Sequence, residues 1–161
     1  MVQFNCSHQH ILLSEFSVFN PKIPFTLAIP SGGICNKEQI LIVGVMLERI
    51  RKLPEISITS DDGTELFHVQ INKAEDTIYR WAAINQTITE KHGKVNDHTT
   101  IDLEEPFTMV ITCDEDGWVL KINSDPSYPN YFHIDDPASA TKVKLSGDMR
   151  VTYVGIGDES K

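Results

Sequence analysis

Apolar and polar residues alternate along short stretches of this chain. In residues 107–113, FTMVITC, and in residues 118–123, WVLKIN, apolar side chains recur at every second position. Successive side chains of a β-strand point to opposite faces, so this period of two predicts strands that bury one face. Similar extended segments are predicted at residues 25–29, 39–46, 55–60, 64–72, 77–84, 141–147 and 149–156.

Tight turns separate these segments. The Asp-Gly pairs at 62–63 and 116–117 are typical of hairpin turns, because glycine accepts a positive φ at little cost. Short strands joined by such turns predict an all-β fold, an antiparallel sandwich or barrel with almost no helix. Leu47, Ile50 and Leu53 recur at helical spacing, but a proline follows directly. We interpret this stretch as a strand end followed by a loop.

The 161 residues fit one domain with a hydrophobic core of its own. The predicted strands all lie within residues 23–157. Residues 1–22 include Phe16 and Phe19, whose rings need burial. We therefore expect an N-terminal arm or an extra strand that packs on the domain, and a short C-terminal tail at residues 158–161.

The formal net charge of -9 argues against nucleic-acid binding, because neutralising phosphates requires a basic surface. The longest apolar run, residues 40–47, is too short to cross a bilayer, so no membrane insertion is expected. Cys6, Cys35 and Cys113 are an odd number without CxxC spacing, which indicates reduced thiols. The first residues lack the basic stretch of a secretory signal, so we expect a cytoplasmic protein.

The order and spacing of three segments resemble the galectin family. Residues 24–46, with PFTLAIP followed by GGICNKEQILIVGVM, are similar to the opening of a galectin domain. EEPFTMVITCDEDGWVLKIN, residues 104–123, resembles the family's Pro-Phe strand, tight turn and strand ending in Asn. VKLSGDMRVTYVGI, residues 143–156, is similar to its closing strands. The resemblance spans about residues 22–157 and implies a two-sheet jelly-roll sandwich of the galectin/concanavalin type.

The resemblance also implies a polar sugar-binding signature on a concave face. Galectins carry H-x-N-x-R on one strand, V-x-N on the next, and W-x-x-E-x-R after it. The His, Asn and Arg form hydrogen bonds with galactose hydroxyls, and the Trp stacks on the apolar face of the sugar ring. The Glu and the last Arg hold each other and the second sugar by charge-assisted hydrogen bonds.

This chain departs from the signature at most positions. His68 stands at the first His, whereas Gln70 and Asn72 stand at the Asn and the Arg. On the next strand, Tyr79 and Trp81 stand where V-x-N has its Val and Asn. An amide does not reproduce the fork of donors that an arginine presents, and a Trp fills space that an Asn leaves open.

The third part of the signature is also altered. Ile88 replaces the stacking Trp, Glu90 or Lys91 stands near the Glu, and Gly93 stands at the last Arg. Losing the Trp removes the surface on which a sugar ring stacks. We therefore expect ordinary β-galactoside binding to be weak or absent.

Two interpretations of these polar positions remain open. His68, Gln70 and Asn72 form either a solvated strand face with an ancestral His, which we favour, or a working sugar site. Trp81 and Tyr79 either pack in the core or form an exposed anchor for a protein or an altered glycan.

Catalysis and metal binding find little support. The chain has no G-x-S-x-G elbow, no H-E-x-x-H and no phosphate-cradling glycine loop. Cys6, His8 and His10 would share one strand face, but no fourth ligand stands at motif spacing. We expect no enzyme, no metal and no other cofactor.

The sequence thus predicts a non-enzymatic galectin-like recognition module whose β-galactoside site is largely lost and which binds a protein. The alternative is a lectin with an altered glycan preference. The partner is accordingly an unidentified protein or an altered glycan, and a homodimer and non-classical secretion both stay open. The candidate ligand-binding residues on the concave face are His68, Gln70, Asn72, Tyr79, Trp81 and Glu90.

Overall fold

The computed structural model describes residues 16–34, 36–88, 93–99 and 101–158. Strands dominate these ranges, and the two 3-10 helices η2 (Lys73–Glu75) and η3 (Pro137–Ser139) have three residues each. The strands are β1 (Ser17–Phe19), β2 (Phe25–Ala28), β3 (Glu38–Met46), β4 (Glu55–Ser60), β5 (Glu65–Asn72), β6 (Thr77–Ile84), β7 (Thr87–Ile88), β8 (Val95–His98), β9 (Pro106–Cys113), β10 (Gly117–Ile122), β11 (Tyr131–Phe132), β12 (Ala140–Ser146) and β13 (Met149–Asp158). The predicted all-β fold is confirmed. No helix in the described part is long and apolar enough to span a membrane.

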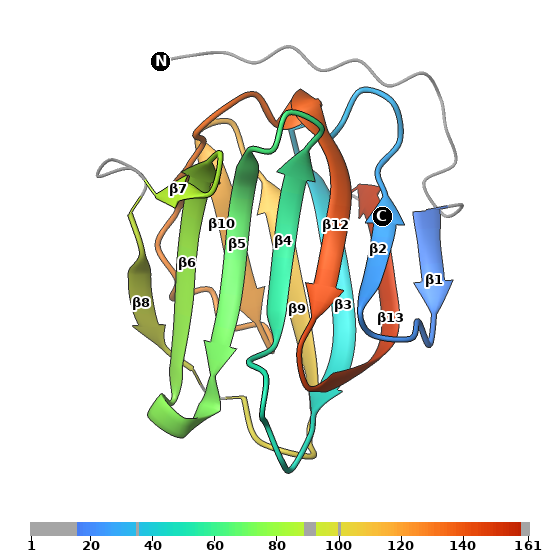
Figure 1. The fold of residues 1–161 in the computed structure, drawn as a ribbon, viewed down its shortest axis with the longest axis vertical. Helices are drawn as coiled ribbons and strands as arrows, with labels where there is room; N and C mark the ends of the chain where they lie inside the picture. The colour runs from blue at the N-terminus through green and yellow to red at the C-terminus, as the bar shows by residue number, and fades with distance from the viewer. Residues whose placement is uncertain (1–15, 35, 89–92, 100, 159–161) are drawn as a thin grey trace.

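Two antiparallel sheets pack face to face (Figure 1). The six-stranded sheet has the order β1-β13-β3-β9-β10-β11. The seven-stranded sheet has the order β2-β12-β4-β5-β6-β7, and β8 also pairs with β6. The arrangement is therefore a sandwich and not a barrel. In both sheets a strand from the start of the chain pairs with one from its end: β1 with β13, and β2 with β12.

The alternating pattern places the core between the sheets. Strand β9 buries Phe107, Met109 and Ile111, while the intervening side chains are only partly buried. Across the sandwich, the rings of Phe67 and Trp118 stack with their centroids 5.9 Å apart. Burying one such side chain stabilises the fold by roughly 1.5–3 kcal/mol relative to exposure.

Three short strands were not predicted from the sequence. Strands β7 and β8 lie in the polar stretch after β6, and β11 follows a loop. Strands β7 and β11 lie at sheet edges, and β8 pairs with the edge of β6 that is opposite β5. A strand that pairs on one side and faces water needs no apolar alternation, so the period of two gives no signal there.

The turn between β12 and β13 depends on Gly147. Its φ is +92°, and a Cβ at this position would lie 2.2 Å from the backbone oxygen of Leu53. The next residue, Asp148, accepts hydrogen bonds from the backbone N–H groups of Arg51 (2.6 Å) and Lys52 (2.8 Å). These bonds hold the connection between β3 and β4, which is a loop as predicted.

The structure describes only residues 16–22 of the segment for which an N-terminal arm or extra strand was predicted. Strand β1 pairs with β13 at the edge of the six-stranded sheet, and Phe16 packs against the core. Phe19 was expected to be buried, but it is 72% exposed because its position on β1 points away from the core. Its ring instead contacts the Tyr153 ring edge-on, with the centroids 5.2 Å apart. The expectation that residues 1–15 pack on the domain lies outside the described residues and stays a prediction.

Candidate functional site

The polar residues of β5 lie on the face of the seven-stranded sheet that points away from the six-stranded sheet, called here the outer face. Val69 and Ile71 are fully buried in the core, so the alternation puts His68, Gln70 and Asn72 on the opposite side. In the neighbouring strand, the core-facing Ile78 and Ala82 leave Tyr79 and Trp81 on this same outer face.

Pairing between strands sets one row of side chains across the outer face. Lys144 of β12 stands opposite Ser57 of β4, Ser57 opposite His68 of β5, and His68 opposite Trp81 of β6. One step along the strands, Glu55 stands opposite Gln70, and Gln70 opposite Tyr79. Facing side chains in adjacent strands lie within contact distance, so these residues form one continuous site.

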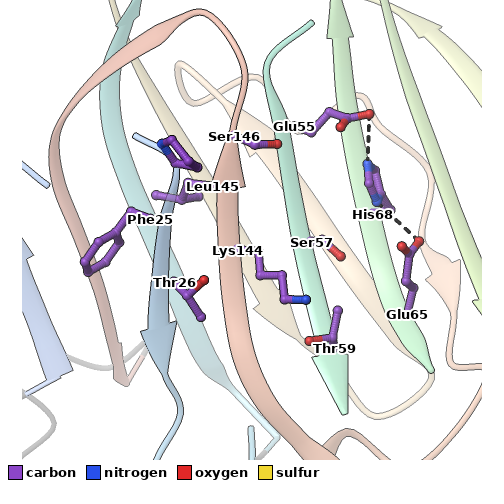
Figure 2. A pocket seen from close by; sticks show the side chains of 11 residues that line it. Phe25, Thr26, Glu55, Ser57, Thr59, Glu65, His68, Lys144, Leu145 and Ser146 are labelled. Atoms are coloured by element: carbon purple, nitrogen blue, oxygen red, sulfur yellow. Dashed lines mark ion pairs between the residues drawn. The ribbon is translucent and has the colours of Figure 1, made fainter. Parts of the chain in front are cut away.

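His68 lies between two carboxylates. Its Nε2 is 3.3 Å from Oε1 of Glu55, and its Nδ1 is 3.3 Å from Oε2 of Glu65, as Figure 2 shows. Each ring nitrogen thus lies at ion-pair distance from one carboxylate, so His68 bridges the side chains of Glu55 and Glu65. The interpretation of a solvated face is wrong for His68, which is only 8% exposed because neighbouring side chains cover it.

The two carboxylates are held in different ways. Hydrogen bonding to His68 lowers the pKa of Glu65 below its usual value of 4.5, an effect that outweighs the rise caused by partial burial. Glu55 Oε1 also accepts a hydrogen bond from Nε2 of Gln70, at 2.8 Å. The amide at the position of the family's Asn is therefore already engaged within the protein.

The Trp81 ring is covered from two sides. The imidazole of His68 stacks on it with the ring centroids 4.0 Å apart and an angle of 14° between the planes. The ammonium of Lys94, just before β8, lies 4.9 Å from the Trp81 centroid and 4.6 Å from that of Tyr79. Because β5 and β8 flank β6 on opposite sides, the two side chains reach Trp81 from opposite directions.

A pocket opens on the outer face beside His68, over β2, β12, β4 and β5 (Figure 2). Its volume is about 250 Å³. Mostly polar side chains line it near His68: Glu55, Ser57, Thr59, Glu65, Lys144 and Ser146. The pocket is large enough for a small polar molecule, and its walls supply both hydrogen-bond donors and acceptors.

The remaining candidate residues lie around this centre. Asn72 is half-buried at the end of β5, and the hydroxyl of Tyr79 donates to Oε2 of Glu75 at 2.6 Å. Ile88 on β7 stands opposite Ala83 and is 45% exposed. Glu90 lies outside the described residues.

Several residues of the site were missed from the sequence. Glu55, Ser57 and Thr59 alternate along β4, and this period of two was a readable signal that they share the face of His68. Lys144 follows the same alternation along β12. Lys94 gave no such signal, because it lies before β8, outside every strand that the sequence predicted.

One charged residue of β6 points the other way. Arg80 lies in the core-facing register and is 1% exposed. Its Nη2 is 2.6 Å from Oδ2 of Asp97 on β8, its Nη1 donates to the carbonyl of Pro129, and its guanidinium faces the Tyr128 ring at 6.0 Å. This ion pair lies beneath the outer face and joins β6, β8 and the loop before β11.

A cysteine and a histidine meet at the far end of β9, but they do not form a reactive pair. Cys113 Sγ lies 4.0 Å from Nε2 of His133, and burial raises the pKa of the thiol to about 12. A thiol with this pKa is not a nucleophile near neutral pH. No group of three potential metal ligands occurs among the described residues, and Cys6, His8 and His10 lie outside them.

The fold agrees with comparisons to known proteins. The sequence profile of the galactoside-binding lectins matches residues 24–156. The chain belongs to the galactoside-binding lectin family. The resemblance noted in the sequence is thereby confirmed for this galectin domain, and no curated protein matches it at the sequence level.

Solved galectins share the fold at low sequence identity. Galectin LEC-6 of Caenorhabditis elegans is 10% identical, with a TM-score of 0.76 over 89% of this chain and 96% of that one. A double-substitution variant of human galectin-16 is 14% identical, with a TM-score of 0.76 over 88% and 99% of the two chains. Sheep galectin-11, solved with glycerol, is 16% identical, with a TM-score of 0.69 over 83% and 97%.

Proposed function

We propose that this galectin domain is a non-enzymatic recognition module that has lost ordinary β-galactoside binding and binds a protein through its outer face. The observation that carries the proposal is the covering of Trp81. His68 stacks against one side of the ring, and the ammonium of Lys94 lies over it from the other direction. With His68 on one face and Lys94 over the other, a sugar could stack on this ring only by displacing a cation that the ring attracts.

The anchors that galactose recognition needs are also absent at other positions. Asn72 replaces the arginine whose planar fork binds hydroxyls in two directions, and Ile88 replaces the tryptophan of the family pattern. Each lost hydrogen bond to a ligand costs roughly 0.5–1.5 kcal/mol. Sugars bind through several such contacts together, so losing two anchors weakens galactoside affinity strongly.

Protein contact suits the side chains that remain. Tyr79 and Trp81 are half-buried neighbours on the outer face, and carboxylates border them. Partly exposed aromatic residues in a polar rim are typical of protein interfaces. A catalytic role gains no support from Glu55 and Glu65, because both carboxylates are already engaged by His68.

Lactose titration followed by NMR tests the loss of the galactoside site. Millimolar lactose is expected to leave the backbone resonances of residues 66–88 unchanged. A triple variant, Asn72→Arg with Trp81→Asn and Ile88→Trp, restores three positions of the family pattern and is expected to gain saturable shifts. Saturable shifts of the unmodified protein centred on His68 would overturn the proposal.

Protein binding is tested by capture of a partner with and without the aromatic anchor. The unmodified domain and the Trp81→Ala variant are immobilised side by side, and retained proteins are compared by mass spectrometry. We expect a protein that the unmodified domain retains and Trp81→Ala does not. A partner retained equally by both would mean that the outer face does not bind it.

The pocket supports a second candidate, a lectin with an altered glycan preference. Its polar lining beside His68 is suited to a hydroxylated ligand. A glycan array would show selective binding in this case, and Ser57→Val, which fills the pocket floor without a hydroxyl, would abolish it. An array without selective binding would leave protein recognition as the function.

A further inference from the structure

Tyr79 and Trp81 together form a cation-binding surface, called here the aromatic platform. The two residues are separated by one position on β6 and therefore project from the same face. One ammonium, that of Lys94, lies within 5 Å of both ring centroids, at 4.6 Å and 4.9 Å. Cations within about 6 Å of an aromatic centroid are attracted by the ring's negative face.

The surroundings reinforce this attraction. The Tyr79 hydroxyl donates to the carboxylate of Glu75, and the carboxylate of Glu65 lies on the side of Trp81 occupied by His68. In the described part of the chain, the two rings are the contacts made by the Lys94 ammonium. The whole chain carries a formal charge of -9, which favours approach of a basic partner.

We propose that the aromatic platform receives a lysine side chain from a basic segment of a protein partner, and that Lys94 occupies the platform until the partner displaces it. This rests on the proposed function of protein recognition and names the chemistry of its partner. Lys94 is itself solvent-exposed, so its ammonium can leave the rings and be hydrated without unfolding any strand.

The proposal makes Lys94 an internal competitor with a measurable effect. An exposed cation–π contact favours the occupied state by about two- to five-fold. The platform is then free for about one third to one sixth of the time, so removing Lys94 should strengthen binding of an external lysine by about three- to six-fold. Removing a different lysine from the same face changes the net charge equally but frees no platform.

Hexalysine peptide is the probe, and NMR of the tryptophan indole N–H groups is the readout. The Trp81 indole is expected to shift on titration, whereas that of Trp118, which is 1% exposed in the core, serves as the internal reference. The same peptide with every side-chain amine acetylated should cause no shift, because it carries no cation for the rings.

Two matched variants separate the platform from general charge attraction. Lys94→Ala should bind hexalysine about three to six times more tightly than Lys142→Ala, which removes an exposed lysine of the outer face that does not line the pocket. Adding Trp81→Leu to Lys94→Ala should remove that gain. Both single variants keep Trp81. Their comparison therefore stays valid even if the double variant fails to fold.

Three outcomes would overturn the proposal. They are equal affinities for Lys94→Ala and Lys142→Ala, hexalysine binding without a shift of the Trp81 indole, and no hexalysine binding by any variant. A positive lactose titration would refute the loss of galactoside binding separately, since it uses a neutral ligand. Failure of the platform and failure of the proposed function are thus distinguishable.

Discussion

Arg80 carries its positive charge inside the sandwich, and its pairing with Asp97 leads to a quantitative prediction. The guanidinium is 1% exposed, whereas the side chain of Asp97 is 23% exposed and touches water. In Asp97→Ala, the buried guanidinium loses its counter-charge and cannot reach solvent. Leaving a buried charge unpaired costs about 3–5 kcal/mol of unfolding free energy.

The reverse substitution should cost less. In Arg80→Met, a side chain of similar volume fills the core, and the carboxylate of Asp97 can be hydrated through its exposed part. The main loss is then the hydrogen bond to the Pro129 carbonyl, which costs about 1–3 kcal/mol if the oxygen stays unsatisfied. Combining Arg80→Met with Asp97→Ala should lower the unfolding free energy no more than Arg80→Met alone, because the double variant contains no buried charge that needs a partner.

Urea unfolding followed by tryptophan fluorescence measures these differences. For a chain of this size, each kcal/mol lowers the melting temperature by about 2–4 °C. Lys73→Met is the matched control: Lys73 pairs with Asp76 at the same 2.6 Å separation, but Asp76 is 51% exposed. Its loss should cost at most about 1 kcal/mol. If Asp97→Ala proves less costly than Arg80→Met, the argument from burial is wrong.

Three further predictions concern other parts of the fold. Trp81→Ala should destabilise the domain by less than Trp118→Ala, a core truncation that costs about 3–5 kcal/mol, and equal losses would place Trp81 in the core. Gly147→Ala should lower the melting temperature more than Gly63→Ala. Both glycines have positive φ, but a Cβ at Gly147 would lie 2.2 Å from a backbone oxygen, whereas a Cβ at Gly63 would lie 3.6 Å from a side-chain atom. Burial lowers the pKa of His133 below 6.5, so folding stability should fall as the pH drops from 6.5 towards the folded-state pKa. His133→Gln should flatten that part of the stability curve in denaturant titrations, and an unchanged slope would contradict the assignment.

The sequence by itself determined the main strands, the hairpin turns and the family. These features are local, because the alternation of side chains along β9 and β10 and the positive φ of Gly63 follow from the backbone geometry of a few consecutive residues. Gly117, predicted as a turn residue, instead begins β10, where a Cβ would lie 2.3 Å from the backbone oxygen of Tyr131. Strands β7 and β8 were not predicted, because a strand that pairs on one side and faces water on the other needs no alternation of apolar and polar residues.

The tertiary structure alone decided what surrounds each candidate residue. Glu55 is thirteen positions before His68 in the chain and reaches its ring through the register of β4 against β5. Lys94 reaches Trp81 across the opposite edge of β6, and Arg80 finds its counter-charge on β8. Sequence spacing identifies which residues share a strand face. The neighbours of that face depend on strand order, register and side-chain rotamers, which only the packed chain determines.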